Sequence, residues 1–279
     1  MSNKIILGTV QFGLDYGVSN KKGIPSNKEL KEIFSLAENN GIFLLDTASG
    51  YGNAEKRIGD ISNGNFKIIT KISNIDNAQS IENQIKKSLF NLKSDFIYGC
   101  LFHNTNELLH NLFLWEELNK LKKLGLIKKI GVSLYHPKNL ENLLSLKIIP
   151  DIIQIPFNII DRRFEPYFER LNKLNIEIHV RSIFLQGLLI NFELMNNNKF
   201  SKWDSLWDQY KSWLKSQEIS PVEAAIGHVA AFKEISYFVV GVEDSLQLNQ
   251  IILASKNRIL KAPKRLISLD NKLINPYLW

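Results

Sequence analysis

The sequence predicts a single closed (β/α)8 barrel, a TIM barrel. Eight short apolar runs alternate with amphipathic segments along the whole chain, as in proteins built from βα units. The runs are apolar throughout rather than alternating, which is typical of parallel strands covered on both faces. Eight such units favour closure over an open doubly wound sheet, and no GxGxxG motif follows the first run. We therefore expect one barrel domain spanning residues 1–279.

Each expected strand is an apolar run that stops at glycine or at polar residues. Gly8 and Thr9 follow the first run, and Gly41 precedes the second. Runs of this length and composition are typical of buried strands. The eight expected strands are residues 5–7, 42–48, 66–71, 96–103, 129–134, 151–156, 177–182 and 235–241.

The segments between the runs carry apolar residues at helical spacing. The first expected helix starts after a cap at Ser26 or Asn27 and ends near Asn40, where Gly41 stops it. Another begins at Pro221, a residue favoured in the first turn. The other expected helices are 54–60, 80–92, 113–124, 139–145, 163–174 and 245–254.

Two later segments depart from the simple βα alternation. Residues 183–219 form a longer excursion with a helix that holds Trp203, Trp207 and Trp213. We expect these tryptophans to pack on the barrel wall, and a substrate lid is the alternative. The tail at residues 275–279 either folds over an edge of the active site or docks elsewhere; the sequence leaves both open.

Composition narrows the class of protein. The net charge is +7, but the lysines are spread along the chain without a basic stripe, which disfavours a nucleic-acid partner. The single cysteine, Cys100, excludes an internal disulfide and a multi-cysteine metal site, and we expect it in the core. No apolar run is long enough for a membrane span, and the start of the chain does not resemble a signal peptide. We expect a cytoplasmic protein, without a metal or a membrane partner.

Four titratable residues stand at the ends of three consecutive expected strands. Asp46 ends the second, Lys71 the third and His103 the fourth, and Tyr51 follows Asp46 on a glycine-flanked turn. In a parallel barrel the carboxyl ends of the strands meet at the mouth where chemistry is done. Taken singly, each residue also fits a structural role. The joint pattern predicts that the four converge on one site.

The types of these residues suit the reduction of a carbonyl. A tyrosine is a weak acid near neutrality, and an adjacent Lys71 ammonium, held by Asp46, is expected to lower the pKa of Tyr51. A neutral His103 can donate a hydrogen bond to the carbonyl oxygen. Donors placed where negative charge develops accelerate such a step.

The sequence resembles the aldo-keto reductases over nearly its whole length. Residues 7–13 look like the opening of that family, and residues 46–55 look like its first signature, which is a specific motif. Similar segments follow at residues 124–133, 151–158 and 186–189. The resemblance implies a TIM barrel, hydride transfer from a nicotinamide cofactor, usually NADPH, to an aldehyde or ketone, and a catalytic tetrad of Asp46, Tyr51, Lys71 and His103.

The resemblance also assigns residues to the cofactor. Ser133 and Gln154 would hold the carboxamide of the nicotinamide, the segment 182–187 would follow the pyrophosphate, and 241–247 would meet the adenosine end. The cofactor residues that it implies are Gly8, Thr9, Ser133, Gln154, Arg181, Ser182, Phe184, Gln186, Gly241, Glu243 and Gln247.

The chain departs from the family pattern in three places. There is no room before Ile5 for the β-hairpin that commonly plugs the bottom of the barrel. Leu134 follows Ser133 where the family usually has asparagine, and Arg181 aligns with a tyrosine that often stacks on the nicotinamide. Arginine can stack on a ring or bind a carboxylate or phosphate, and both roles stay open. Glu243 and Asp244 occupy a region where NADPH-preferring members often carry Lys or Arg, so NADH is an alternative to NADPH.

The expected function is reduction of a small aldehyde or ketone by NAD(P)H, with Tyr51 as general acid, in a monomer or small homo-oligomer. A sugar-like or anionic substrate is preferred because of Arg181, the basic charge balance and the absence of an evident aromatic loop at the mouth. Two alternatives are a nicotinamide-binding sensor or accessory protein with little turnover, and an unrelated TIM-barrel lyase or isomerase. The latter would need a phosphate site after the last two strands, which the turn at 242–244 does not suggest.

Overall fold

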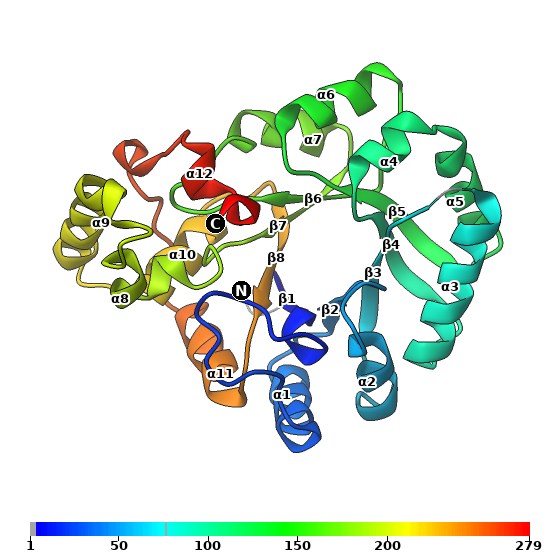
Figure 1. Cartoon of the computed structure of the whole chain (residues 1–279), viewed down its shortest axis with the longest axis horizontal. Helices are drawn as coiled ribbons and strands as arrows, with labels where there is room; N and C mark the ends of the chain where they lie inside the picture. The colour runs from blue at the N-terminus through cyan, green and yellow to red at the C-terminus, as the bar shows by residue number, and fades with distance from the viewer. Residues whose placement is uncertain (1–3, 76) are drawn as a thin grey trace.

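The computed structural model describes residues 4–75 and 77–279 and has the predicted closed barrel of eight parallel strands (Figure 1). Strand β1 pairs with β2 on one side and with β8 on the other, from Ile5 opposite Phe238 to Gly8 opposite Gly241, which closes the sheet. The strands are β1 (Ile5–Gly8), β2 (Leu44–Asp46), β3 (Lys67–Ile72), β4 (Ile97–Phe102), β5 (Ile127–Ser133), β6 (Ile152–Pro156), β7 (Glu177–Arg181) and β8 (Ile235–Gly241).

The strands form where predicted because their apolar runs are buried on both faces. Side chains of five strands fill the barrel interior as one cluster, made of Ile6, Leu44, Ile69, Leu101 and Ile152. This packing makes the barrel a solid core with its site at one end. Strand β2 is shorter than the predicted 42–48, because Ile42 still belongs to the turn that ends the preceding helix: its N–H donates to the carbonyl of Ala37 at 2.9 Å.

Helices surround the barrel in sequence order (Figure 1). Ser26, rather than Asn27, caps the first one, accepting from the N–H of Glu29 at 3.1 Å. The helices are α1 (Asn27–Asn39), α2 (Ala54–Ile61), α3 (Ala78–Leu92), α4 (Thr105–His110), α5 (Phe113–Lys123), α6 (Pro137–Ser145), α7 (Phe168–Lys173), α8 (Phe192–Met195), α9 (Asp204–Gln217), α10 (Pro221–Ala230), α11 (Ser245–Ala254) and α12 (Asn271–Ile274).

One predicted helix starts later than expected, and the helix after β4 was not predicted. Helix α7 starts at Phe168 instead of 163, because a 3-10 turn at Glu165–Tyr167 precedes it and contains Pro166, which has no N–H to donate. Helix α4 was not predicted. It follows His103 directly and is short, which gives little helical periodicity to detect.

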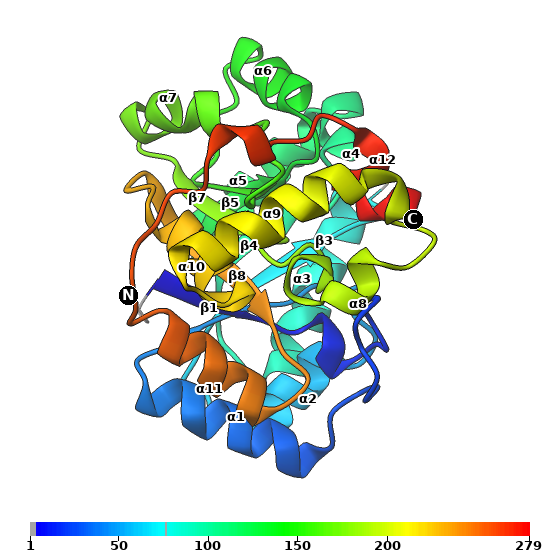
Figure 2. The same cartoon turned by 90° about the vertical axis from the view of Figure 1, so that its left-hand side faces the viewer.

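The tryptophans of the excursion do not pack on the barrel wall as predicted. Trp207 and Trp213 are buried in a second apolar cluster that contains no strand residue. That cluster joins α9 to α10 and to the C-terminal segment, which passes beside them (Figure 2). Its other members include Ile160, Leu189 and Leu273. Residues 183–219 therefore form a side lobe, and the C-terminal tail packs against this lobe on its way to the mouth of the barrel.

The described part of the chain begins at Lys4, just before β1. The predictions that the chain lacks a β-hairpin and a signal peptide before β1 concern residues 1–3, which lie outside the described residues. Cys100 is fully buried, in agreement with a core role. Across residues 4–75 and 77–279, none of the helices has the length and apolar character that crossing a membrane requires.

Candidate active site

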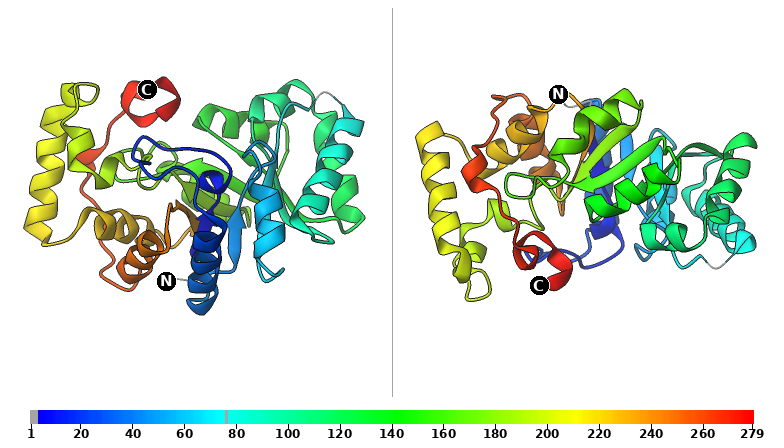
Figure 3. Two further views of the ribbon diagram at one scale, coloured as in Figure 1. Left: turned by 60° about the horizontal axis from the view of Figure 1, so that its bottom comes forward. Right: turned by 90° about the horizontal axis from the view of Figure 1, so that it is seen from above.

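One large cavity opens at the carboxyl ends of the strands. Its volume is about 720 Å³, within the range of small-molecule sites. The loop after β1, the segment around α8 and the C-terminal tail gather at this end, opposite the start of β1 (Figure 2), and the same segments meet in both views of Figure 3. All four predicted catalytic residues line the cavity: Asp46, Tyr51, Lys71 and His103.

Asp46 and Lys71 form a buried ion pair at the base of the cavity. The Lys71 ammonium donates to Asp46 Oδ2 at 2.6 Å and to the carbonyl of Thr47 at 2.9 Å. Gln154 Nε2 donates to the other carboxylate oxygen of Asp46 at 2.7 Å. The exposed fractions of the Lys71 and Asp46 side chains are 1% and 6%. Both carboxylate oxygens are therefore satisfied, and the lysine is held in one position with one N–H left over.

Thr9, the residue that follows β1, holds the backbone of Asp46 in place. The N–H and the hydroxyl of Thr9 donate to the Asp46 carbonyl at 2.9 and 3.0 Å. Thr9 was predicted as a cofactor residue, and although it lines the cavity, its hydroxyl is engaged here. The predicted cofactor residue Gln154 likewise holds Asp46, a link that strand positions alone did not indicate.

Tyr51 is presented by a turn that packs backbone against backbone. A Cβ at Gly13 would lie 2.0 Å from the Tyr51 carbonyl oxygen, and a Cβ at Gly52, where φ is +57°, would lie 2.4 Å from the Gly13 carbonyl oxygen. Only glycine fits at both positions. The two glycines dock the turn and direct the phenol into the cavity, where the Lys71 ammonium lies 5.2 Å from the centre of its ring.

The electrostatic environment of Tyr51 differs from the prediction. Burial, followed by the negative charge of Asp46, raises the pKa of Tyr51 well above its usual value of 10.0, and the positive charge of Arg181 opposes this. Lys71 does not lower the pKa as expected, because Asp46 compensates its charge at 2.6 Å. Its own pKa is lowered by burial. Tyr51 is thus protonated at neutral pH, the form that an acid needs.

His103 completes the group of four. It follows β4, and its ring meets that of Tyr51 edge to face with the centroids 5.9 Å apart. Burial first, and then the charge of Lys71, lowers the pKa of His103 to about 4. The imidazole is neutral at physiological pH, as the sequence predicted, and can donate one N–H while accepting at the other nitrogen.

The low pKa of His103 gives a direct prediction. Its ring proton resonance should stay constant between about pH 5.5 and 7.5, where a free histidine titrates, and should move only near pH 4. Since the folded state favours the neutral ring, acidification below about pH 6.5 should also reduce stability. An NMR titration, with His103→Gln to assign the signal, measures this. A midpoint near 6.5 would contradict the described environment.

The residues predicted for a dinucleotide lie along the same cavity. Ser133 and Gln154 line it beside the ion pair, Ser182, Phe184 and Gln186 line it further out, and Gly241, Glu243 and Gln247 line its other end. Gly8 lies on the wall between. The buried Gln11 Oε1, in the same wall, has no partner among the described residues. A cavity lined by these residues, with an unused polar atom, fits a polar ligand such as a dinucleotide.

The segment after β7 has a distinctive backbone. Ser182, Leu185, Gln186 and Gly187 all have positive φ, between 48° and 88°. These values fold the chain into a tight wall, and a Cβ on Gly187 would lie 2.1 Å from the Ser19 hydroxyl. Gln186 donates to the Tyr16 hydroxyl at 3.1 Å. The loop after β1 therefore closes over the segment predicted to follow the pyrophosphate.

The segment predicted to meet the adenosine, residues 241–247, carries two acidic residues. Glu243 lies just after β8, and burial raises its pKa. Asp244 caps α11 by accepting from the N–H of Gln247 at 2.7 Å and forms an ion pair with Lys22. Lys22 comes from the loop after β1 and was not predicted, because its partner lies more than two hundred residues away in the sequence.

Sequence reasoning also missed an aromatic rim above Tyr51. Tyr16, Tyr135 and Tyr277 line the cavity, so the expectation of a mouth without aromatic residues was wrong. The hydroxyls of Tyr135 and Tyr277 lie 2.7 Å apart. The tail thus reaches the edge of the active site, the first of the two options that the sequence left open. Tyr135 lies two positions after Ser133, which was the one available signal.

Within the described ranges, 4–75 and 77–279, no group of three or more His, Cys, Asp or Glu side chains is arranged to hold a metal ion. Arg181 ends β7, one residue before the predicted end at Ser182, and lines the cavity.

Comparison with known proteins agrees with this geometry. The model of the aldo/keto reductase family matches residues 4–263. The uncharacterized oxidoreductase YqkF of Bacillus subtilis is 27% identical over 269 residues, covering 85% of each chain. An aldo-keto reductase of Mycolicibacterium vanbaalenii is 31% identical over 139 residues, covering 47% of this chain and 50% of its own.

Solved structures give the same fold. The holo form of the aldo-keto reductase AKR11C1 from Bacillus halodurans superposes with a TM-score of 0.75 at 19% identity, covering 92% of this chain and 88% of its own. The glycerol dehydrogenase AKR11B4 from Gluconobacter oxydans has a TM-score of 0.71 at 18% identity, with 94% and 88% covered. At these identities the likeness concerns the barrel fold alone.

Proposed function

The chain belongs to the aldo/keto reductase family, and we propose that it reduces the carbonyl group of a small polar aldehyde or ketone with Tyr51 as the general acid. As a member of that family it is an NAD(P)H-dependent oxidoreductase. The observation that carries the specific proposal is the convergence of Tyr51, His103 and the Asp46–Lys71 ion pair on one cavity.

Each of the four residues has a distinct role in this proposal. NAD(P)H, when bound, supplies the hydride. Tyr51 gives its phenolic proton to the carbonyl oxygen, and the transfer is favourable because an alkoxide is far more basic than a phenolate. The neutral His103 donates a hydrogen bond to the same oxygen and positions it. The ammonium of Lys71 lies 5.2 Å from the centre of the Tyr51 ring and helps to hold the phenol in place, and Asp46 keeps the lysine charged and fixed.

The cavity wall would hold the cofactor. Ser133 and Gln154 lie beside the tetrad and suit the carboxamide, and the tight segment 182–187 suits the pyrophosphate. Membership of the family favours NADPH over NADH as the cofactor. Lys22 is the cation near the adenosine end, and its ammonium is paired with Asp244. We therefore propose that NADPH binds with Lys22 exchanging Asp244 for the 2′-phosphate, whereas NADH requires only acceptors such as Glu243 for the ribose hydroxyls.

A fluorescence titration with NADPH and NADH, followed by a screen of aldehydes for cofactor oxidation, tests the proposal. We expect binding of both cofactors, tighter for NADPH, and oxidation in the presence of an aldehyde.

Lys22→Gln should weaken NADPH binding about three- to tenfold, as for one exposed charge contact, and leave NADH binding unchanged. Binding without turnover on any carbonyl would favour a cofactor-binding sensor. Absence of binding would contradict the proposal.

A further inference from the structure

We propose that the physiological substrate carries a carboxylate in addition to its carbonyl group, and that Arg181 binds this carboxylate while Tyr16, Tyr135 and Tyr277 enclose the remainder of the molecule. The inference rests on the proposed function, because it names the substrate class of the same site. It is carried by the contacts of Arg181, by the charge balance of the cavity and by the composition of the rim.

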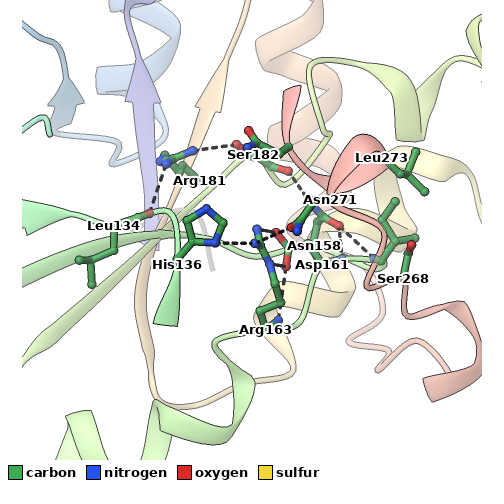
Figure 4. Close-up of polar contacts among 12 residues, drawn as sticks. Leu134, His136, Asn158, Asp161, Arg163, Arg181, Ser182, Ser268, Asn271 and Leu273 are labelled. Atoms are coloured by element: carbon green, nitrogen blue, oxygen red, sulfur yellow. Dashed lines mark hydrogen bonds and ion pairs between the residues drawn. The ribbon is translucent and has the colours of Figure 1, made fainter. Parts of the chain in front are cut away.

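Arg181 is held in place by neutral groups only. Its guanidinium lies 4.2 Å from the centre of the Tyr135 ring and donates to the Leu134 carbonyl and to the Ser182 hydroxyl, both at 3.3 Å (Figure 4). Between residue 4 and residue 279, Asp76 aside, no carboxylate lies within ion-pair distance, 4.0 Å, of the Arg181 guanidinium. A guanidinium has five N–H donors in a planar fork, and two of the five are used. The others are free for a ligand.

The neighbouring Arg163 shows what a compensated arginine looks like in this cavity. Its Nε and Nη2 donate to the two carboxylate oxygens of the buried Asp161, each at 2.9 Å, and its Nη1 lies 3.3 Å from His136 Nδ1 and donates to Asn271 at 3.4 Å (Figure 4). Arg163 is therefore neutralised and fixed by the protein. Arg181 has no such partner.

The charge balance of the inner cavity points the same way. Lys71 is paired with Asp46 and Arg163 with Asp161, whereas the other two carboxylates that line the cavity, Glu193 and Glu243, make no ion pair with Arg181. Among the described cations that line the cavity, Arg181 is the one without a carboxylate partner. A single fork-shaped cation matches a monoanionic carboxylate, whereas a phosphate dianion would call for a second cation.

Arg181 lines the same cavity as Tyr51 and His103, so both ends of one small molecule can be bound there together. Its positive charge opposes the rise in the pKa of Tyr51 and contributes to the low pKa of His103, so it acts on both side chains. A substrate whose carboxylate pairs with Arg181 can therefore present its carbonyl to Tyr51 and His103.

The rim suits a polar carbon chain. Tyr16, Tyr135 and Tyr277 come from the loop after β1, the loop after β5 and the tail, and each brings a hydroxyl beside an aromatic face. Tyr135 is partly buried beneath Arg181, and Tyr277 is 71% exposed at the entrance. Aromatic faces cover carbon–hydrogen surface, while the hydroxyls bond to polar substituents of the substrate. A sugar acid that carries an aldehyde or ketone has this combination of groups.

A matched pair of aldehydes tests the inference. We would compare 4-carboxybenzaldehyde with its neutral isostere 4-formylbenzamide, with the wild type and with Arg181→Gln and Arg181→Lys. The wild type should prefer the carboxylate about ten- to hundredfold in kcat/KM, as for a charged hydrogen bond. Arg181→Gln should lose this preference, because the KM for the carboxylate rises more than the KM for the amide, and Arg181→Lys should keep part of it.

Arg170→Gln is the control: Arg170 lies on α7 in an exposed pair with Glu141 of α6, so the substitution removes one positive charge and should leave the preference unchanged. The inference would be overturned by a wild type without charge preference, or by an Arg181→Gln variant that retains it. An equal loss for both aldehydes, with weaker NADPH binding, would instead assign Arg181 to the cofactor and also overturn it. Failure of the proposed function is distinguishable, because neither aldehyde would then be reduced by the wild type.

Discussion

Replacing Tyr51 with phenylalanine should lower kcat/KM for carbonyl reduction by about 10²–10⁴-fold, the range of general acid catalysis. The substitution removes one hydroxyl and keeps the ring, which packs against the core and meets His103 edge to face. The affinity for NADPH should change by no more than a few-fold, because no predicted cofactor contact involves the phenol. Steady-state kinetics and a fluorescence titration on the same preparation measure both quantities.

Tyr167→Phe is a suitable control, because it makes the same chemical change outside the cavity, where the ring only packs against the core. It should retain wild-type turnover. If Tyr51→Phe also retains near-wild-type turnover, Tyr51 is not the acid. If it loses cofactor binding in proportion to its activity, the phenol has a binding role rather than a catalytic one.

Breaking the buried ion pair should have the largest effect on stability. Removing one partner leaves an uncompensated charge in the core, which typically costs about 3–5 kcal/mol. Asp46→Asn leaves the ammonium of Lys71, whose pKa is already lowered by burial. Since the folded state then disfavours the protonated lysine, the loss of stability should shrink as pH rises towards 10.5, where the unfolded chain also releases that proton.

Lys71→Met should also be less stable than the wild type. It leaves the buried Asp46 carboxylate without its cation. The double variant should be more stable at neutral pH than either single one, because no buried charge remains. Urea unfolding across a pH series measures this, and the exposed pair Lys56–Asp60 gives a control whose disruption should have little effect. Two single variants as stable as the wild type, or a double variant less stable than both, would contradict the role of the buried pair.

Much of the fold was predictable because it follows from local patterns. The strand at Ile235–Gly241 and the helix at Ser245–Ala254 have the predicted bounds, since an apolar run, a glycine and an Asp cap delimit them within a few residues. The four residues around Tyr51 were predictable for a related reason. In a parallel barrel, a residue at the carboxyl end of its strand must lie at the mouth, whatever the loops do.

The rest depended on contacts between distant segments. Tyr135 and Tyr277 are 142 positions apart in the sequence, and Lys22 and Asp244 are 222 positions apart. No local sequence pattern could therefore predict the aromatic rim or the contact between the loop after β1 and α11. The direction of the Tyr51 pKa was wrong for a similar reason. The sequence indicated which charges surround the phenol, but not how deeply it is buried or that Lys71 is fully engaged by Asp46.

The central claim is that this chain transfers a hydride from a reduced nicotinamide to a carbonyl carbon at the site around Tyr51. Incubation with NADPH that carries deuterium at the transferable position, followed by mass spectrometry of the product, tests it most directly. We expect one deuterium on the carbinol carbon of the alcohol with the wild type, and product reduced by about 10²–10⁴-fold with Tyr51→Phe. An alcohol without deuterium, or labelled product formed equally by both proteins, would contradict it.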